Sequence, residues 1–385
     1  MFIYNFTEFS KIDFFSLGEY FEGPAEDISL KALLNLNDDN LTPFAKTLLD
    51  ANKIHENLEL ILKELTRGIR AFSEFQDILD VPLNTSDTGI INRHYAYFES
   101  LVYLRESVVS CLNGNLLAAL TLLRPSLELA IIHLYWFSKC ELDKSYKLYY
   151  KWLKSHASML PFKNSLDYVI DKLPSKEHVD EKRLQELKQI TTSIYKSLCA
   201  YHHSPKIDES VTVKSGVGGI SLEILFYYLH IATILLHQMV YLFILSYPMS
   251  LFPVERHKKW SFSGPVGIFF DKTNFAILEH FVGSHNISAL KEQLENIPRV
   301  QSLIEWFESF PELTPEEMDA DWAKLEEEVP NLKKEGTKDI RQRLALAKSL
   351  NRSRNWALNY SVEAKQKNSL SDETIEYLKK RVRNW

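Results

Sequence analysis

The chain has 385 residues, of which 45% are apolar and 25% are charged, and its formal net charge is −6. These values are ordinary for a soluble globular protein that can bury a large core. Only 12 glycines argue against a β-rich or Rossmann-type fold with many tight turns. The three cysteines form no CxxC pair, and no basic segment followed by an apolar one marks a secretory signal peptide. We therefore expect a cytoplasmic protein.

The charge is spread unevenly along the chain. Residues 331–385 contain 14 Lys and Arg against 6 Asp and Glu, a local net charge of +8, so residues 1–330 carry −14. A basic C-terminal segment on an acidic chain indicates a partner of its own, whether an acidic protein surface, nucleic acid or anionic lipid.

The first predicted helix follows an aromatic and acidic N-terminal stretch. Thr42-Pro43 fits a helix start, with Thr as N-cap and Pro in the first turn, and apolar periodicity extends to about Ile78. Pro, Asn, Asp and Gly in 81–89 then break the helix. The spacing predicts a second helix over 91–112, and the turn at 113–115 should fold the next helix back antiparallel to it.

That next helix carries Pro125 in an almost wholly apolar run, so we expect it to kink there or to restart near Arg124. Helical periodicity continues through an aromatic helix around 142–153, a helix over 183–201 and a helix over 222–247. Residues from about 44 to 250 are therefore expected to form a nearly all-helical bundle.

Three regions follow from this pattern. We expect an N-terminal loop and long helix at 1–85, a helical bundle at 86–252, and a charged helical C-terminal region at 253–385. A short β-hairpin or an extended packing arm is expected near 260–278, where WSFSGPVGIFF precedes TNFAIL. The predicted fold class is all-α, a central antiparallel helical bundle with a charged helical C-terminal region.

One segment is long enough to cross a membrane. No Asp, Glu, Lys or Arg occurs from Ile224 to Val254, and 224–247 has the length of a bilayer span. Basic residues follow, as in a positive-inside flank, but His230, Thr233 and His237 recur on one face of this helix. Such a polar stripe is typical of a core helix packed on all sides. We expect no membrane partner, and a membrane-anchored helical component is the remaining alternative.

Arg124 and Glu128 are the first candidate site. They are four residues apart and project about 40° apart on a helix, whereas His133 projects to the opposite side from Arg124. Charged groups are rarely buried unless paired. Two hypotheses follow: an anion-binding or catalytic Arg held by its Glu, or a structural pair that reaches Arg105 or Glu106 on the antiparallel neighbour. The structural pair is favoured.

His202 and His203 lie in the sequence YHHSP, which closes a helix. The helix dipole favours His at a C-terminus, and His can also act as a general acid or base or contact a phosphate. The candidate catalytic residues are Arg124, Glu128, His202 and His203. No HExxH or CxxC spacing accompanies the histidines, so no metal site is predicted, and no motif predicts a cofactor.

The basic C-terminal segment is the candidate nucleic-acid interface. Its basic groups could neutralise phosphates while the aromatic residues Trp356 and Tyr360 stack on bases. Alternatively, it forms a solvated helical face that pairs with the acidic block at 305–328. The candidate nucleic-acid-binding residues are Arg341, Arg343, Lys348, Arg352, Arg354 and Trp356.

A helical hairpin that carries LLAALTLLRPSLELAI, and a later helix that ends in SLCAYHHSP, resemble bacterial HEPN-like helical proteins, some of them linked to phage defence. The resemblance covers about 90–250 and implies an HEPN-like bundle. Members of that superfamily that cleave RNA do so as dimers, with an Arg and a His separated by four to six residues. No His in this chain follows an Arg at that spacing.

The favoured hypothesis is a binding or assembly module of a prokaryotic defence or stress system that contacts RNA, DNA or a partner protein, including a second copy of itself. It is not primarily expected to be an enzyme. The rival hypothesis is a metal-independent HEPN-like ribonuclease or toxin.

Overall fold

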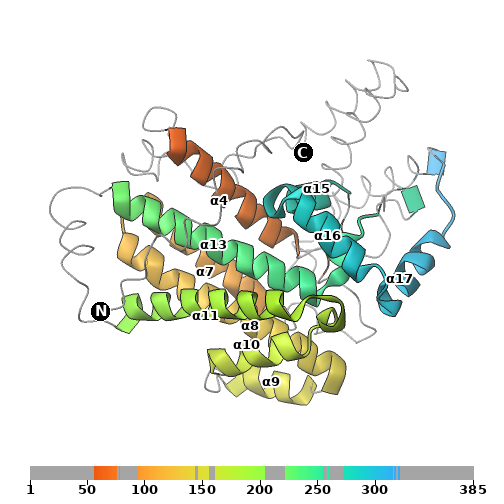
Figure 1. Ribbon diagram of the computed structural model, residues 1–385, viewed down its shortest axis with the longest axis horizontal. Helices are drawn as coiled ribbons and strands as arrows, with labels where there is room; N and C mark the ends of the chain where they lie inside the picture. Colours follow the sequence, from red (N-terminus) through yellow and green to blue (C-terminus); the bar gives the residue numbers. More distant parts are fainter. Residues whose placement is uncertain are drawn as a thin grey trace, which may run out of the picture.

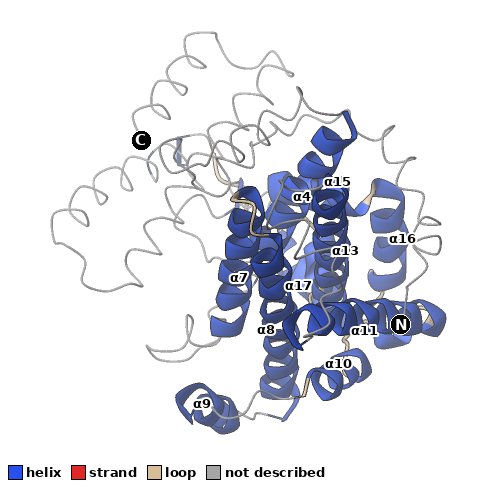
Figure 2. Cartoon of the chain, turned by 90° about the vertical axis from the view of Figure 1, so that its left-hand side faces the viewer, coloured by secondary structure: helices blue, strands red, loops and turns tan. Residues whose placement is uncertain are grey.

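The computed structural model describes residues 56–75, 78, 94–143, 146–155, 161–203, 222–254, 258–259, 270, 272–314, 316–317 and 320. Within these ranges the secondary structure consists of helices, and no strand occurs (Figure 2). The backbone N–H of Val254 donates to the carbonyl of Phe270 at 2.9 Å. The predicted all-α fold class is confirmed for the described part of the chain.

A helical hairpin forms the middle of the molecule (Figure 1). Helix α7 spans Tyr95–Leu112 and α8 spans Leu116–Asp143, and the turn between them places Gly114 at φ 83°. This left-handed conformation is one that glycine adopts readily. The helix boundary at 112 and the antiparallel return are as predicted.

Two serine contacts fix the register of this hairpin. Ser107 Oγ donates to the carbonyl of Ala119 at 2.6 Å, and Ser100 Oγ donates to the carbonyl of Ser126 at 2.7 Å. The second contact lies seven residues back along α7 and seven residues on along α8, as antiparallel helices require. Ser126 Oγ donates in return to the carbonyl of Ser100 at 2.9 Å. Small side chains at this crossing let the two backbones approach closely.

Helix α8 runs through Pro125 as one continuous helix. The alternative of a restart near Arg124 is therefore wrong. Pro125 lacks a backbone N–H, so it removes one intrahelical hydrogen bond without ending the helix.

Helices α13 (Leu222–Ser246) and α4 (Glu56–Glu74) complete the core against the hairpin. Phe243 of α13 makes edge-on contacts with Phe72 and Phe75, at centroid distances of 5.1 and 5.2 Å. Phe72 in turn contacts Tyr97 of α7 at 5.2 Å. Aromatic rings from three helices thus meet in one buried cluster, which accounts for the aromatic-rich composition.

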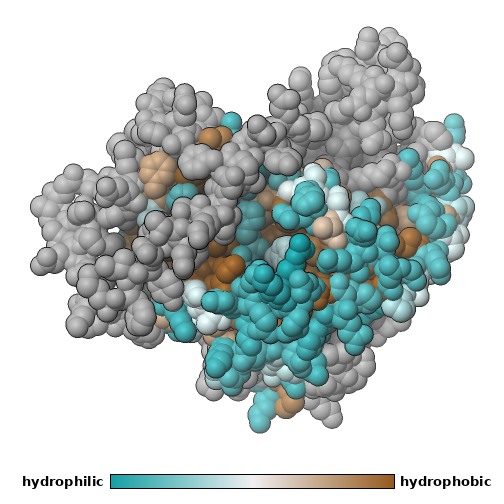
Figure 3. Space-filling view, in the orientation of Figure 1, coloured by the Kyte–Doolittle hydropathy of each residue, from teal (hydrophilic) through white to brown (hydrophobic). Residues whose placement is uncertain are grey.

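The edge of the bundle is formed by α9 (Tyr146–Ser155), α10 (Phe162–Asp171) and α11 (Glu181–His203). A 3₁₀ turn at Lys176–His178 joins α10 to α11, and a second 3₁₀ turn at Pro248–Leu251 follows α13. Hydrophilic side chains dominate the face over α10 and α11 (Figure 3). The predicted helices at 142–153 and 183–201 correspond to α9 and α11, with shifted ends.

The C-terminal described part consists of α15 (Lys272–Val282), α16 (Ser284–Leu294) and α17 (Pro298–Glu308). Residues 272–278 are helical, so the β-hairpin expected near 260–278 is wrong in its second half. Its first half, 260–269, lies outside the described residues. The buried residues Ile277, Leu278 and Phe281 recur at helical spacing and pack α15 into the core.

Two described helical segments, Leu116–Cys140 and Leu225–Ser246, are long and apolar enough to cross a membrane. In the second, 72% of the apolar window is buried inside the molecule. Core helices of soluble proteins meet the same length and composition limits. The interpretation of 224–247 as a core helix therefore stays a prediction.

Candidate functional site

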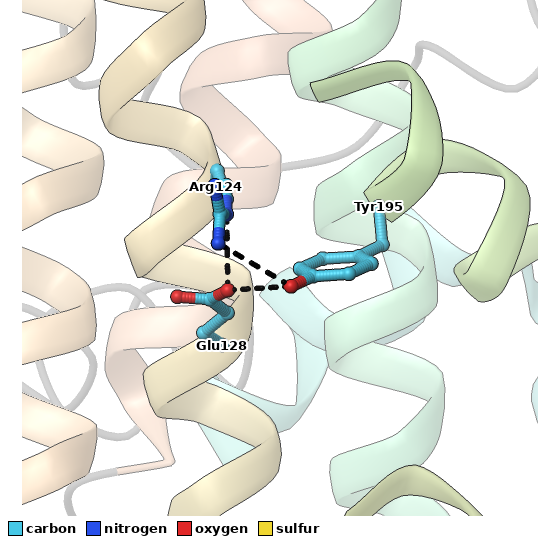
Figure 4. A network of polar contacts seen from close by, with 3 residues as sticks. All are labelled: Arg124, Glu128 and Tyr195. Carbon is cyan, nitrogen blue, oxygen red and sulfur yellow. Dashed lines mark hydrogen bonds and ion pairs between the residues drawn. The ribbon is translucent and has the colours of Figure 1, made fainter. Parts of the chain in front are cut away.

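Arg124 and Glu128 meet a third residue, Tyr195 of α11 (Figure 4). Arg124 Nε donates to Glu128 Oε1 at 3.0 Å, and the Tyr195 phenol donates to the same oxygen at 2.8 Å. The Arg124 Nη2 atom lies 3.5 Å from the phenol oxygen, and the guanidinium carbon lies 5.5 Å from the centroid of the Tyr195 ring. We call Arg124, Glu128 and Tyr195 the Arg–Glu–Tyr cluster.

The cluster lies at the edge of the core rather than on the open surface. The Arg124 and Glu128 side chains are 18% and 12% exposed. The Tyr195 ring stacks on Phe162 of α10, with centroids 3.9 Å apart and planes 10° apart. Three helices therefore meet at this point: α8 supplies the ion pair, α11 the phenol and α10 the ring that holds the phenol in place.

Electrostatics fix the charge states of the cluster. Burial alone would lower the pKa of Arg124, but the hydrogen bond and charge of Glu128 outweigh it and raise that pKa. Burial raises the pKa of Tyr195, and the hydrogen bond to the Glu128 carboxylate raises it further. Arg124 is thus a guanidinium cation, and Tyr195 is a neutral phenol that donates a hydrogen bond to Glu128. Such an arrangement holds helices together, and the neutral phenol is not a nucleophile at neutral pH.

Arg105 and Glu106, the partners considered for the ion pair from the sequence, pair with each other instead. Arg105 Nη1 lies 3.0 Å from Glu106 Oε1, and both side chains are 47% exposed. The prediction of a structural pair thus named the wrong neighbour. The third member comes from α11, and no spacing in the sequence pointed to Tyr195.

His202 and His203 are the last two residues of α11. His202 follows Tyr195 by seven residues, about two turns, so its backbone position lies on the same side of the helix about 10 Å further along. His203 is turned about 80° from that side. The fold therefore brings the helix that carries both histidines against the Arg–Glu–Tyr cluster.

His133, which the helical projection separates from Arg124, has partners on other elements. Its Nε2 atom lies 2.9 Å from the Tyr247 hydroxyl, and its ring stacks on Phe243 with a centroid distance of 5.6 Å. The His94 ring lies 5.5 Å away. Burial, and then the charge of His94, hold the pKa of His133 well below its usual range. His133 is thus a neutral core residue.

A second polar contact inside the bundle joins α4 to α13. Glu64 Oε1 lies 3.6 Å from His237 Nε2, and Glu64 Oε2 lies 3.8 Å from Arg67. The His237 ring stacks on Phe281 at 4.0 Å. The polar stripe seen in the sequence included His237 but gave no sign of Glu64. Among the described residues, no group of three His, Cys, Asp or Glu side chains is placed to hold a metal ion.

The six candidate nucleic-acid-binding residues, Arg341, Arg343, Lys348, Arg352, Arg354 and Trp356, lie outside the described residues. Their assignment stays a prediction from the sequence.

Comparisons with protein-family models, with curated proteins and with solved structures find no match to this chain.

Proposed function

We propose that the protein is a binding or assembly module that contacts nucleic acid or a partner protein through residues 331–385. The observation that carries the proposal is the charge asymmetry, +8 in this segment against −14 in the rest of the chain. Polyanions attract such segments through the release of counterions. A role in a prokaryotic defence or stress system is part of the proposal and rests on the HEPN-like resemblance of 90–250.

The Arg–Glu–Tyr cluster supports binding over catalysis. A ribonuclease site would need Arg124 as its cation. In the structure, however, Arg124 donates its Nε hydrogen bond to Glu128 and forms an ion pair with it. The Tyr195 phenol is likewise directed at Glu128. These groups join helices, so the basic segment supplies the better candidate for contact with a polyanion.

The test uses the full chain with five basic residues of the segment neutralised: Arg341→Gln, Arg343→Gln, Lys348→Gln, Arg352→Gln and Arg354→Gln. Binding to a labelled single-stranded RNA is titrated over a range of salt concentrations. If all five contact phosphates, the slope of log K against log salt should fall in magnitude by about 3.5. A control carries the same charge change at exposed positions of the helical body: Lys163→Gln, Lys182→Gln, Lys196→Gln, Lys291→Gln and Arg299→Gln.

The proposal is supported if the control binds as the wild type does and the segment variant does not. It fails if the segment variant keeps wild-type affinity for RNA, for DNA and for any partner protein that co-purifies with the chain.

A metal-independent ribonuclease is the second candidate function. It is favoured by one observation: α11, which contacts Arg124 and Glu128 through Tyr195, is also the helix that ends in His202 and His203. Cleavage of labelled RNA in the presence of a chelator is the assay. Purified protein that leaves RNA intact, or activity that survives both His202→Ala and His203→Ala, excludes this function.

A further inference from the structure

His133 is enclosed by the helical core, and its contacts within the described residues are with aromatic rings and one hydroxyl. Its Nε2 atom lies 2.9 Å from the Tyr247 hydroxyl. Its ring stacks on the Phe243 and Tyr247 rings, at centroid distances of 5.6 and 6.4 Å. The His94 and Tyr97 rings lie 5.5 and 5.8 Å away. The proposed function does not use this histidine.

No Asp or Glu of the described residues contacts His133 to offset a positive charge on its ring. The titratable groups that face it are His94, which precedes α7, Tyr97 of α7, and Tyr247, which follows α13. The Tyr97 hydroxyl donates to the carbonyl of Phe72 on α4 at 2.7 Å. His94, once charged, would repel a charged His133. A positive charge on His133 is therefore uncompensated.

Protonation would also change the hydrogen bonding of the His133 ring. An imidazolium donates from both ring nitrogens, whereas a neutral imidazole donates from one. His133 Nδ1 is buried and has no hydrogen-bond partner, so a charged ring would need water at this atom. Burial holds the pKa of His133 well below its usual range, and the charge of His94 lowers it further. Acid therefore favours a conformation in which water reaches the ring.

Tyr247 belongs to the part of the His133 site that is easiest to open. It lies just beyond α13 and directly precedes the 3₁₀ turn at Pro248–Leu251. The N–H of Ser250 donates to the carbonyl of Tyr247 at 2.8 Å, a bond that spans three residues. Such bonds have poorer geometry than those of an α-helix. The short segment 247–254 can therefore move away while the long helices around the ring stay in place.

The segment 247–254 also contacts α16. Lys291 Nζ of α16 lies 5.6 Å from the centroid of the Phe252 ring. Helix α16 packs on the 3₁₀ turn, near the end of α13 (Figure 1). Along the chain, α16 is followed by α17 and then by the C-terminal region. Movement of 247–254 would therefore loosen the contact between the bundle and α16.

We propose that the contact between His133 and Tyr247 is a pH-sensitive switch, which opens the segment 247–254 when His133 is protonated. The α7–α8 hairpin stays folded in the open form. The opening admits water to the His133 ring and frees Phe252 from Lys291 of α16. This switch goes beyond the proposed function and uses residues distinct from 331–385.

The test measures amide hydrogen exchange of the full chain between pH 5.5 and 7.5, corrected for the intrinsic exchange rate at each pH. Four amides report on the segment, those of Tyr247, Ser250, Phe252 and Val254, because each donates to a backbone carbonyl. Their protection should fall about tenfold per pH unit below about pH 6.5, since the open form binds one more proton than the closed form. Amides of residues 104–120 in the hairpin should stay protected at every pH.

Three variants assign the pH dependence to this contact. In His133→Gln, protection of the four amides should no longer change with pH. His285→Gln removes an exposed histidine of α16, and it should keep the wild-type pH dependence. Tyr247→Phe removes the hydrogen bond that favours the closed form, and it should lower protection at pH 7.5 about fivefold. None of these measurements depends on RNA binding, so failure of the proposed function leaves the result unchanged.

The proposal is overturned if protection of the four amides in the wild type does not change with pH, or if His133→Gln keeps the wild-type pH dependence. An equal loss of protection in residues 104–120 also overturns it, because acid would then unfold the whole bundle. If His133→Gln does not fold, Tyr247→Phe decides, and wild-type protection at pH 7.5 in that variant overturns the proposal.

Discussion

The phenol of Tyr195 and the carboxylate of Glu128 share a hydrogen bond of 2.8 Å, although the two residues are 67 positions apart in the sequence. The same carboxylate oxygen accepts the Nε–H of Arg124 at 3.0 Å. One oxygen atom thus joins α8 to α11. Because these groups are largely shielded from water, their hydrogen bonds act in a medium of low dielectric constant, where losing one partner is costly.

Replacing Tyr195 with Phe should destabilise the fold by about 1–2 kcal/mol, because it removes the donor to Glu128 and leaves the stacking on Phe162 in place. Urea denaturation of both proteins measures the difference in the free energy of unfolding. Tyr95→Phe is the matched control, since the Tyr95 side chain is 43% exposed, and it should change stability little. Equal stability of Tyr195→Phe and the wild type would contradict the assigned role of the phenol.

Arg124→Met should cost about 3 kcal/mol, because it leaves the carboxylate of Glu128 mostly buried without its cation. The double variant Arg124→Met/Glu128→Leu should recover much of that loss, since it removes both charges together. A double-mutant cycle from denaturation curves gives the coupling energy. Simple additivity of the two single losses would show that the pair does not act as a unit.

Gly68→Ala tests the packing of α4 against α15. A Cβ atom at Gly68 would lie 2.7 and 2.8 Å from two ring carbons of Phe281, and Phe281 is only 1% exposed. Alanine favours a helix over glycine by about 1 kcal/mol, but overpacking a buried ring costs about 1–3 kcal/mol. We expect net destabilisation, measured as a lowered melting temperature. A stabilised variant would mean that Phe281 moves aside freely.

The stability of the protein should fall on acidification because His133 is buried in its neutral form. Its neutral ring is buried among His94, which precedes α7, Tyr97 of α7, Phe243 of α13, and Tyr247. Its pKa is depressed in the folded state. Below about pH 6.5 the unfolded chain therefore binds a proton that the folded chain does not. Stability should fall by about 1.4 kcal/mol for each pH unit below that value, until the folded-state pKa is reached.

Denaturation of wild type and His133→Gln between pH 5 and 8 measures this dependence. Glutamine can still hydrogen-bond to Tyr247 but does not titrate, so the variant should lose less stability on acidification than the wild type. Parallel curves for the two proteins would contradict the assignment.

The helical architecture could be predicted because it follows from local patterns. Apolar periodicity predicted α7, α8, α11 and α13. The turn at Asn113–Asn115 predicted that α7 and α8 form a hairpin. The error at 272–278 has a physical cause. A short apolar run such as TNFAIL is compatible with a helix or a strand. The helix forms because it lets Ile277, Leu278 and Phe281 pack together against the core.

The candidate site could be predicted only in part. Arg124 and Glu128 stand out, since two opposite charges four residues apart are rare in an apolar run. Tyr195 does not stand out, because its role depends on how α11 packs on α8. The same holds for Glu64, which meets His237 only after α4 packs on α13. Contacts between distant segments are not encoded in local periodicity.

The central claim is that the Arg–Glu–Tyr cluster holds the fold while residues 331–385 bind a polyanion. The most direct test compares RNA affinity in two full-length variants, Arg124→Met/Glu128→Leu and the five-fold Gln variant of residues 341–354. We predict wild-type affinity for the first variant and a large, salt-dependent loss for the second. Loss of RNA affinity in the first variant, with wild-type affinity in the second, would contradict the claim and place the site at the cluster.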